Sequence, residues 1–135
     1  MDYAEISKET IGFLYKSRKS LKDSPLDKTI FALIELRVSQ INGCSYCCHI
    51  HTEEARKLGV QDEKIDQLPD FSNSSLFSEE EKLAIHWSES VTRIAEDLSQ
   101  KRELLREFYS EREIVDLTAC ISLMNAFNRI VLSLK

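Results

Sequence analysis

Residues 26–43 read LDKTIFALIELRVSQING, and this stretch decides the fold class. Its apolar residues recur at helical spacing and cover more of the helix surface than one stripe, which indicates a helix buried on most sides. They are Leu26, Ile30, Phe31, Leu33, Ile34, Leu36, Val38 and Ile41. Ser24-Pro25-Leu26-Asp27 predicts the helix start, with Ser24 as N-cap and Pro25 at the first helical position. Asn42-Gly43 predicts the end, because glycine adopts the left-handed cap conformation without a Cβ penalty.

Helical patterns continue on both sides of this stretch. The predicted helices cover residues 3–20, 24–41, 45–58, 62–68, 78–97, 101–108 and 110–134. Ser78-Glu79-Glu80-Glu81 and Ser110-Glu111-Arg112-Glu113 are capping boxes, in which a serine and the glutamate three residues later cap the helix start together. We therefore expect an all-α fold, a compact bundle of about six to seven helices forming a single domain over residues 1–135. The last helix carries more apolar surface than a monomer's outer helix normally shows, so we expect part of it to contact another subunit.

Composition supports helices and restricts the partners. The 135 residues include 42% apolar and 30% charged residues, which is typical of a globular protein, and three Gly and two Pro are few for an all-β fold. The net charge of −5 gives no attraction to nucleic acid or anionic lipid, so we expect neither partner. We find no apolar run near the roughly 20 residues of a membrane span and no secretion signal at the start. The expected location is the cytoplasm, where structural disulfides are rare.

The segment CSYCCHIH at residues 44–51 concentrates the reactive side chains. At about 100° per residue, Cys44, Cys47 and His51 fall on one face of a helix that starts at the cysteines. A helix start favours thiolates, and a histidine one turn beyond Cys47 can take its proton. This pattern favours redox chemistry, with Cys47 as the attacking thiol and Cys44 as the resolving thiol.

Other interpretations of these residues stay open. In a thioredoxin-like site the earlier cysteine, Cys44, is the reactive one. The cysteines could also be buried structural thiols, or Cys44, Cys47 and His51 could bind zinc with Cys120 or His86 as fourth ligand. Cys48 points about 100° away from Cys47, which is typical of a packed bystander, although it could trap a sulfenic acid. Cys120 lies in an apolar helix, and we expect it to be a core thiol.

Residues 36–59 resemble the AhpD-like alkylhydroperoxidase branch of the carboxymuconolactone decarboxylase family, in its small single-domain members with a CxxC pair. Residues 83–92 and 124–129 are similar to segments of the same proteins. The resemblance implies an all-helical fold assembled as dimers, trimers or hexamers. It also implies a peroxide-reducing dithiol in which Cys47 attacks, Cys44 resolves and His51 belongs to a proton relay. No flavin, haem or nucleotide signature is present, so we expect no cofactor and no metal.

The acidic member of the relay does not transfer by position. The family often carries a glutamate twelve residues before the first cysteine, where this chain has Ala32. Glu35, one helical turn later, and Glu89, on the helix after Ser78, are the candidates. Tyr46 replaces a histidine that some relatives carry between the cysteines. Asn125 and Asn128 lie in an apolar helix, and we expect them to bond across a helix or subunit contact.

These observations predict a thiol-dependent peroxidase in antioxidant defence, with a hydroperoxide as substrate and an external dithiol or thiol protein as reductant. The chemistry passes through a Cys47 sulfenic acid and a Cys44–Cys47 disulfide. One alternative is a non-enzymatic redox sensor or assembly module whose disulfide changes subunit packing. Another is a lactone decarboxylase of the carboxymuconolactone type, which should survive loss of both cysteines.

Overall fold

A computed structural model describes all residues of the chain, 1–135. It is all-helical, as predicted, and contains six helices of eight or more residues. The α-helices are α1 (Tyr3–Ile6), α2 (Lys8–Ser20), α3 (Lys28–Ile41), α4 (Ser45–Lys57), α5 (Asp62–Asp66), α6 (Glu79–Arg93), α7 (Leu98–Leu105) and α8 (Glu111–Leu134). Two 3₁₀ helices, η1 (Leu21–Asp23) and η2 (Leu68–Asn73), complete the fold.

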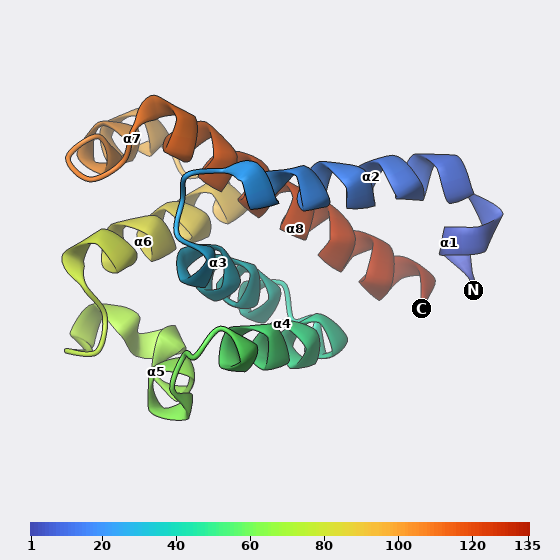
Figure 1. Cartoon of the computed structure of the whole chain (residues 1–135), viewed down its shortest axis with the longest axis horizontal. Helices are drawn as coiled ribbons and strands as arrows, with labels where there is room; N and C mark the ends of the chain where they lie inside the picture. Colours follow the sequence, from blue (N-terminus) through green and yellow to red (C-terminus); the bar gives the residue numbers. More distant parts are fainter.

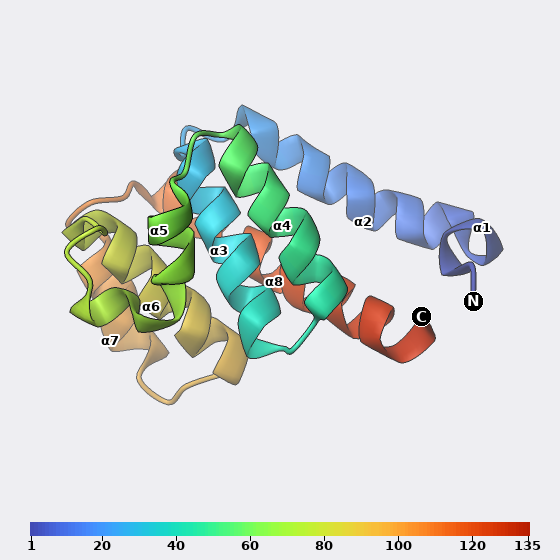
Figure 2. The ribbon, with the colours of Figure 1, turned by 90° about the horizontal axis from the view of Figure 1, so that it is seen from below.

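Helix α3 forms the centre of the molecule. It packs against α4, α6 and α8, and nine of its fourteen residues are buried, as its broad apolar surface predicts. Figures 1 and 2 show that α2 packs against α8 on one side of α3, and that α4 packs on another side of α3. Both views also place the N-terminal turn of α1 beside the C-terminal end of α8. This arrangement brings α2, α3 and α8 close to the start of α4.

The prediction of Ser24 as the N-cap of α3 was wrong, because Asp27 caps the helix. The Asp27 carboxylate accepts hydrogen bonds from the Thr29 amide and the Thr29 hydroxyl, and Ile30 is the first buried residue of the helix. Ser24 instead accepts from the Leu26 amide in the preceding turn. Serine and aspartate are comparable N-caps by residue type, and the ionised Asp27 carboxylate also interacts favourably with the positive end of the helix dipole.

The predicted first helix also divides in two. Ser7 has non-helical backbone angles and separates α1 from α2. The helix that begins at the cysteines is therefore the fourth α-helix, α4, and not the third helix as in the predicted order. Serine weakens a helix interior because its side chain competes for backbone hydrogen bonds. Helix α6 ends at Arg93, before the predicted Asp97, because Ile94 adopts the left-handed conformation with φ of 52°. Both predicted capping boxes are confirmed at Ser78 and Ser110.

The expectation for the two asparagines of α8 is confirmed within the chain. Asn42 Nδ2 donates to Asn125 Oδ1 at 3.0 Å and to Asn128 Oδ1 at 2.9 Å. Asn128 is fully buried and its own Nδ2 donates to Ser39 Oγ at 3.1 Å. This network ties the end of α3 to α8 and so fixes the chain just before the cysteines.

Helix α8 corrects the prediction that no apolar run approaches the length of a membrane span. Its most apolar 18-residue window has a mean hydropathy of 1.4, enough by length and composition to cross a membrane, although only 28% of that window is buried. The helix packs against α3, α6 and α2, and it buries the polar Asp116 and Asn128. It therefore serves as a core helix of this bundle.

Candidate active site

The two cysteines of the CxxC pair lie at the junction of α3 and α4. Gly43, with φ of +68°, turns the chain after α3, and Cys44 follows in an extended conformation as the N-cap of α4. Cys47 lies in the first turn of α4, and its amide donates to Cys44 Sγ at 3.4 Å. A disulfide joins Cys44 and Cys47, whose Cα atoms are 5.2 Å apart. The helix thus begins at the cysteines, as the sequence predicts.

Cys47 and His51 line one cavity of about 160 Å³. Both side chains are buried in the protein, whereas Cys44 is more deeply buried and does not line the cavity. The wall is mostly apolar and comes from α1, α2, α4 and α8. Its residues are Tyr3, Tyr15, Arg18, Tyr46, Cys47, Ile50, His51, Glu54, Met124, Phe127 and Val131. Of the two sulfurs, Cys47 is therefore the one that a molecule in this cavity meets.

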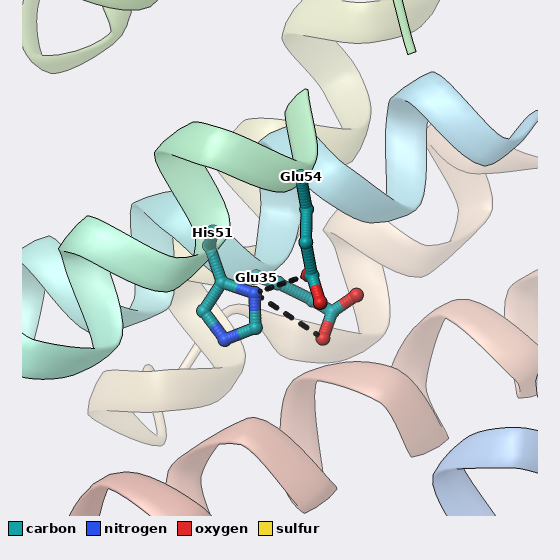
Figure 3. Close-up of side chains that lie close together, drawn as sticks. All are labelled: Glu35, His51 and Glu54. Atoms are coloured by element: carbon teal, nitrogen blue, oxygen red, sulfur yellow. Dashed lines mark hydrogen bonds and ion pairs between the residues drawn. The ribbon is translucent and has the colours of Figure 1, made fainter. Parts of the chain in front are cut away.

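His51 contacts two carboxylates through the same ring nitrogen (Figure 3). Its Nδ1 lies 2.9 Å from Glu54 Oε2 and 3.8 Å from Glu35 Oε2. Glu54 comes from the next turn of α4, and Glu35 reaches the site from α3. Arg18 on α2 bonds both carboxylates, with Nε 2.7 Å from Glu35 Oε2 and Nη2 3.0 Å from Glu54 Oε2. The contact at Nδ1 leaves Nε2 of the imidazole for another partner.

Hydrogen bonds and charge perturb two of these groups. The hydrogen bond with His51 lowers the pKa of the Glu54 carboxyl, burial opposes this effect, and the Arg18 charge adds to the lowering. Burial lowers the pKa of the Arg18 guanidinium, but its hydrogen bond and ion pair with Glu35, joined by Glu54, outweigh burial and raise it. At neutral pH the site therefore holds an ionised Glu54 beside a permanently charged Arg18.

A second cavity of about 230 Å³ lies next to the same arginine. Arg18, Glu35 and Cys120 line it together with Leu21, Lys22, Lys28 and Phe31. Burial raises the pKa of the Cys120 thiol well above its usual value, and the charge of Glu35 adds to this effect. Cys120 is 3% exposed and packs in the main core, so the prediction of a core thiol is confirmed.

The sequence pattern of the carboxymuconolactone decarboxylase family matches residues 11–90, more than half of the chain. The chain belongs to this family. Among curated relatives it is 34% identical to the uncharacterized protein YdfG of Bacillus subtilis (strain 168), over 99% of this chain and 92% of that protein. It is 31% identical to the uncharacterized protein YnjA of Escherichia coli (strain K12), over 85% of this chain and 61% of that protein.

Two crystal structures share the fold. One is ATU0492 of Agrobacterium tumefaciens, described as a protein of unknown function and suggested to be the antioxidant defence protein AhpD; the TM-score is 0.91 at 32% identity, covering 98% of this chain and 92% of that one. The other is an uncharacterized peroxidase-related protein of Silicibacter sp. TM1040, with a TM-score of 0.84 at 24% identity, covering 93% of this chain and 68% of that one. The AhpD-like fold expected from residues 36–59 is thereby confirmed.

The two candidate glutamates of this family member lie in different places. Glu35 is buried beside His51 and pairs with Arg18. Glu89, the other relay candidate, lies elsewhere: its Oε2 is 2.6 Å from Arg37 Nη2, and the residue does not line the Cys47 cavity. Sequence reasoning missed Glu54, although its position three residues after His51 on a helix is a direct signal of contact. It also missed Arg18, which no local pattern links to the site.

None of the remaining cysteines and histidines lines the Cys47 cavity. Cys48 is half-buried and packs against the core, and burial raises the pKa of its thiol. His49 is exposed. His86 is also exposed, beside the Phe71 ring and 3.8 Å from Glu89. Cys120, the other fourth ligand considered for zinc, lines the second cavity.

One cluster of potential ligand atoms forms at the site, from Glu35, His51 and Glu54, whose atoms lie within 4.8 Å of one another. Both of its carboxylates already bond the Arg18 guanidinium, which supplies the positive charge that a cation would bring. The cluster is therefore a salt-bridge network around His51. It does not contain the cysteines of the zinc interpretation.

Proposed function

We propose that this protein is a thiol-dependent peroxidase that reduces organic hydroperoxides in antioxidant defence. The observation that carries the proposal is the shared cavity of Cys47 and His51, with Cys44 bonded to Cys47 behind it. The cysteine pair that would act as the dithiol, the histidine that would act as the base and a cavity that would admit the substrate lie together there. Relatedness to the AhpD-like proteins supports the same class of activity.

In the reduced protein, His51 Nε2 accepts the proton of the Cys47 thiol, while Nδ1–H donates to Glu54. The Cys47 thiolate attacks the terminal oxygen of the hydroperoxide, the O–O bond breaks, and the alkoxide leaves as alcohol after taking the proton from His51. Cys47 becomes a sulfenic acid, oxidised by two electrons. The Cys44 thiol then loses its proton as its sulfur attacks the Cys47 sulfur, the S–S bond forms, the S–O bond breaks, and the leaving hydroxide takes up that proton to depart as water.

An external dithiol must reduce the Cys44–Cys47 disulfide after each turnover, because the two electrons come from outside the chain. A cytoplasmic location suits this need, since that compartment supplies thiol reductants. We also propose a homo-oligomer, in which exposed apolar residues of α7, of α8 and of the turn between them meet a second copy. They include Leu104, Phe108, Val115 and Leu132.

The cavity favours an organic substrate over hydrogen peroxide. Most of its wall is apolar or aromatic, and Tyr15 stacks on Phe127 with ring centroids 5.2 Å apart. An apolar group on the hydroperoxide would displace water from this surface and add binding free energy of about 25 cal/mol for each Å² buried. Hydrogen peroxide offers no such group.

The direct test is steady-state reduction of cumene hydroperoxide with dithiothreitol as reductant. The wild type should consume the peroxide, Cys47→Ser should abolish consumption, and Cys48→Ser should retain it. Equal activity in the two variants would refute the assignment. Formation of the disulfide without turnover would favour the redox sensor instead, and activity on a carboxylated lactone in a variant lacking both cysteines would favour the decarboxylase.

A further inference from the structure

Arg18 connects helix α2 to both carboxylates that face His51. Its Nε donates to Glu35 on α3, and its Nη2 donates to Glu54 on α4. Arg18 lies in the last turn of α2. The two carboxylates that it bonds lie on α3 and α4, which pack against each other. The planar fork of a guanidinium suits this double contact, which a lysine ammonium does not reproduce.

Arg18 also lines both cavities. His51 and Glu54 line the cavity of Cys47, and Glu35 lines the second cavity. One side chain therefore contacts the carboxylate on each side of the site. Glu54 Oε2 accepts from Arg18 and from His51, so the guanidinium holds the carboxylate oxygen that orients the imidazole.

Three groups dominate the charge around His51. Glu54 and Glu35 bring two negative charges within 3.8 Å of Nδ1, and Arg18 cancels one of them. Helix α8 adds no charged group to the Cys47 cavity, where it contributes Met124, Phe127 and Val131. The other titratable side chains that line the two cavities are Tyr3, Tyr15, Tyr46, Lys22, Lys28 and Cys120.

Resting on the proposed function, we propose that Arg18 is a positioning residue that sets the ionisation of the Cys47–His51 pair. It does so by holding Glu54 against His51 and by cancelling the charge of one of the two carboxylates. A single net negative charge stabilises the imidazolium that forms when Cys47 ionises. A second uncancelled charge would oppose the nearby thiolate and move Cys47 ionisation to higher pH.

The test measures the rate at which iodoacetamide alkylates Cys47 in the reduced protein, as a function of pH, by peptide mass spectrometry. Arg18→Met should move the profile to higher pH by about one unit. Glu35→Gln should also move it to higher pH, because Arg18 then neutralises Glu54 and no net negative charge stabilises the imidazolium. Arg18→Lys, which retains the charge, should shift the profile less than Arg18→Met. The matched control is Arg56→Met, since the exposed Arg56 also bonds two carboxylates, Glu53 and Asp62, outside both cavities.

The double variant Arg18→Met with Glu35→Gln keeps the test valid if Arg18→Met fails to fold, because no buried carboxylate is left unpaired. It restores a net charge of minus one beside His51, so its profile should return to that of the wild type. The proposal is overturned if Arg18→Met and Arg56→Met give the same profile, or if the double variant stays at the Arg18→Met position. Alkylation requires no peroxide, so this result is independent of whether the protein turns over hydroperoxides.

Discussion

His51 Nδ1 lies 2.9 Å from Glu54 Oε2, and the two side chains come from neighbouring turns of α4. The helix itself therefore builds the contact that fixes the imidazole, and Cys47, one turn earlier, lines the same cavity. The base, its orienting carboxylate and the thiol are thus local in sequence. Only Glu35 and Arg18 must be brought in by tertiary packing.

Glu54→Gln should lower peroxidase activity by about tenfold or more, because a neutral amide no longer holds the imidazole or stabilises the imidazolium. The measurement is the initial rate of cumene hydroperoxide reduction at neutral pH, with circular dichroism to verify the helices. Glu53→Gln is the matched control, since Glu53 precedes Glu54 and bonds only Arg56. Equal losses in the two variants would remove Glu54 from the mechanism.

Cys44→Ser should accumulate a sulfenic acid on Cys47 after one equivalent of hydroperoxide. Cys48 does not resolve it, because Cys48 packs against the core and burial raises the pKa of its thiol. Dimedone labelling followed by peptide mass spectrometry detects the sulfenic acid. A Cys47–Cys48 disulfide in this variant would instead give Cys48 a part in the reaction.

Asp27→Ala should destabilise the protein by about 1 kcal/mol at pH 7, because the N-cap of the central helix is lost. Hydrogen bonds from the Thr29 hydroxyl and amide lower the pKa of Asp27 in the folded state. The stabilisation is therefore complete above the unfolded pKa of about 3.9 and is lost as pH falls through the lower folded value. Urea unfolding of both proteins at neutral and acidic pH should show the difference shrink in acid, and Asp27→Asn should retain most of the stability.

Ile94→Gly should stabilise the protein by about 1 kcal/mol, because Ile94 is left-handed at the end of α6 and is 81% exposed. Glycine adopts this conformation without a Cβ penalty, and little packing is lost. The melting temperature should rise accordingly. Val115→Gly, at an exposed β-branched position inside α8, is the contrasting control and should lower it. An unchanged or lower melting temperature for Ile94→Gly would contradict the inferred strain.

Local patterns were sufficient for most of the fold. Apolar spacing identified α3, and the capping boxes at Ser78 and Ser110 fixed two helix starts, because these signals act within one turn. Ser24 and Asp27 are both good caps by residue type. Choosing between them requires knowing where the first turn packs, since burial of Ile30 depends on tertiary contacts.

The candidate site also contains some residues that local patterns predict and others that depend on tertiary packing. The phase of one helix was enough to place Cys47 and His51 on a common face, and Glu54 was equally accessible to that argument. The place of Glu89 could not be predicted from sequence, because its partner Arg37 lies 52 residues away on another helix. Arg18 depends on how α2 crosses α3 and α4, which no periodicity in the chain encodes.

In the proposed reaction, Cys47 transfers two electrons to a hydroperoxide and Cys44 completes the reaction by forming the disulfide. It is tested most directly by reacting reduced protein with limiting cumene hydroperoxide and identifying the disulfides by peptide mass spectrometry. One Cys44–Cys47 disulfide should form for each peroxide consumed, and none should form in Cys47→Ser. Peroxide consumption without that disulfide, or formation of the disulfide that does not depend on peroxide, would contradict it.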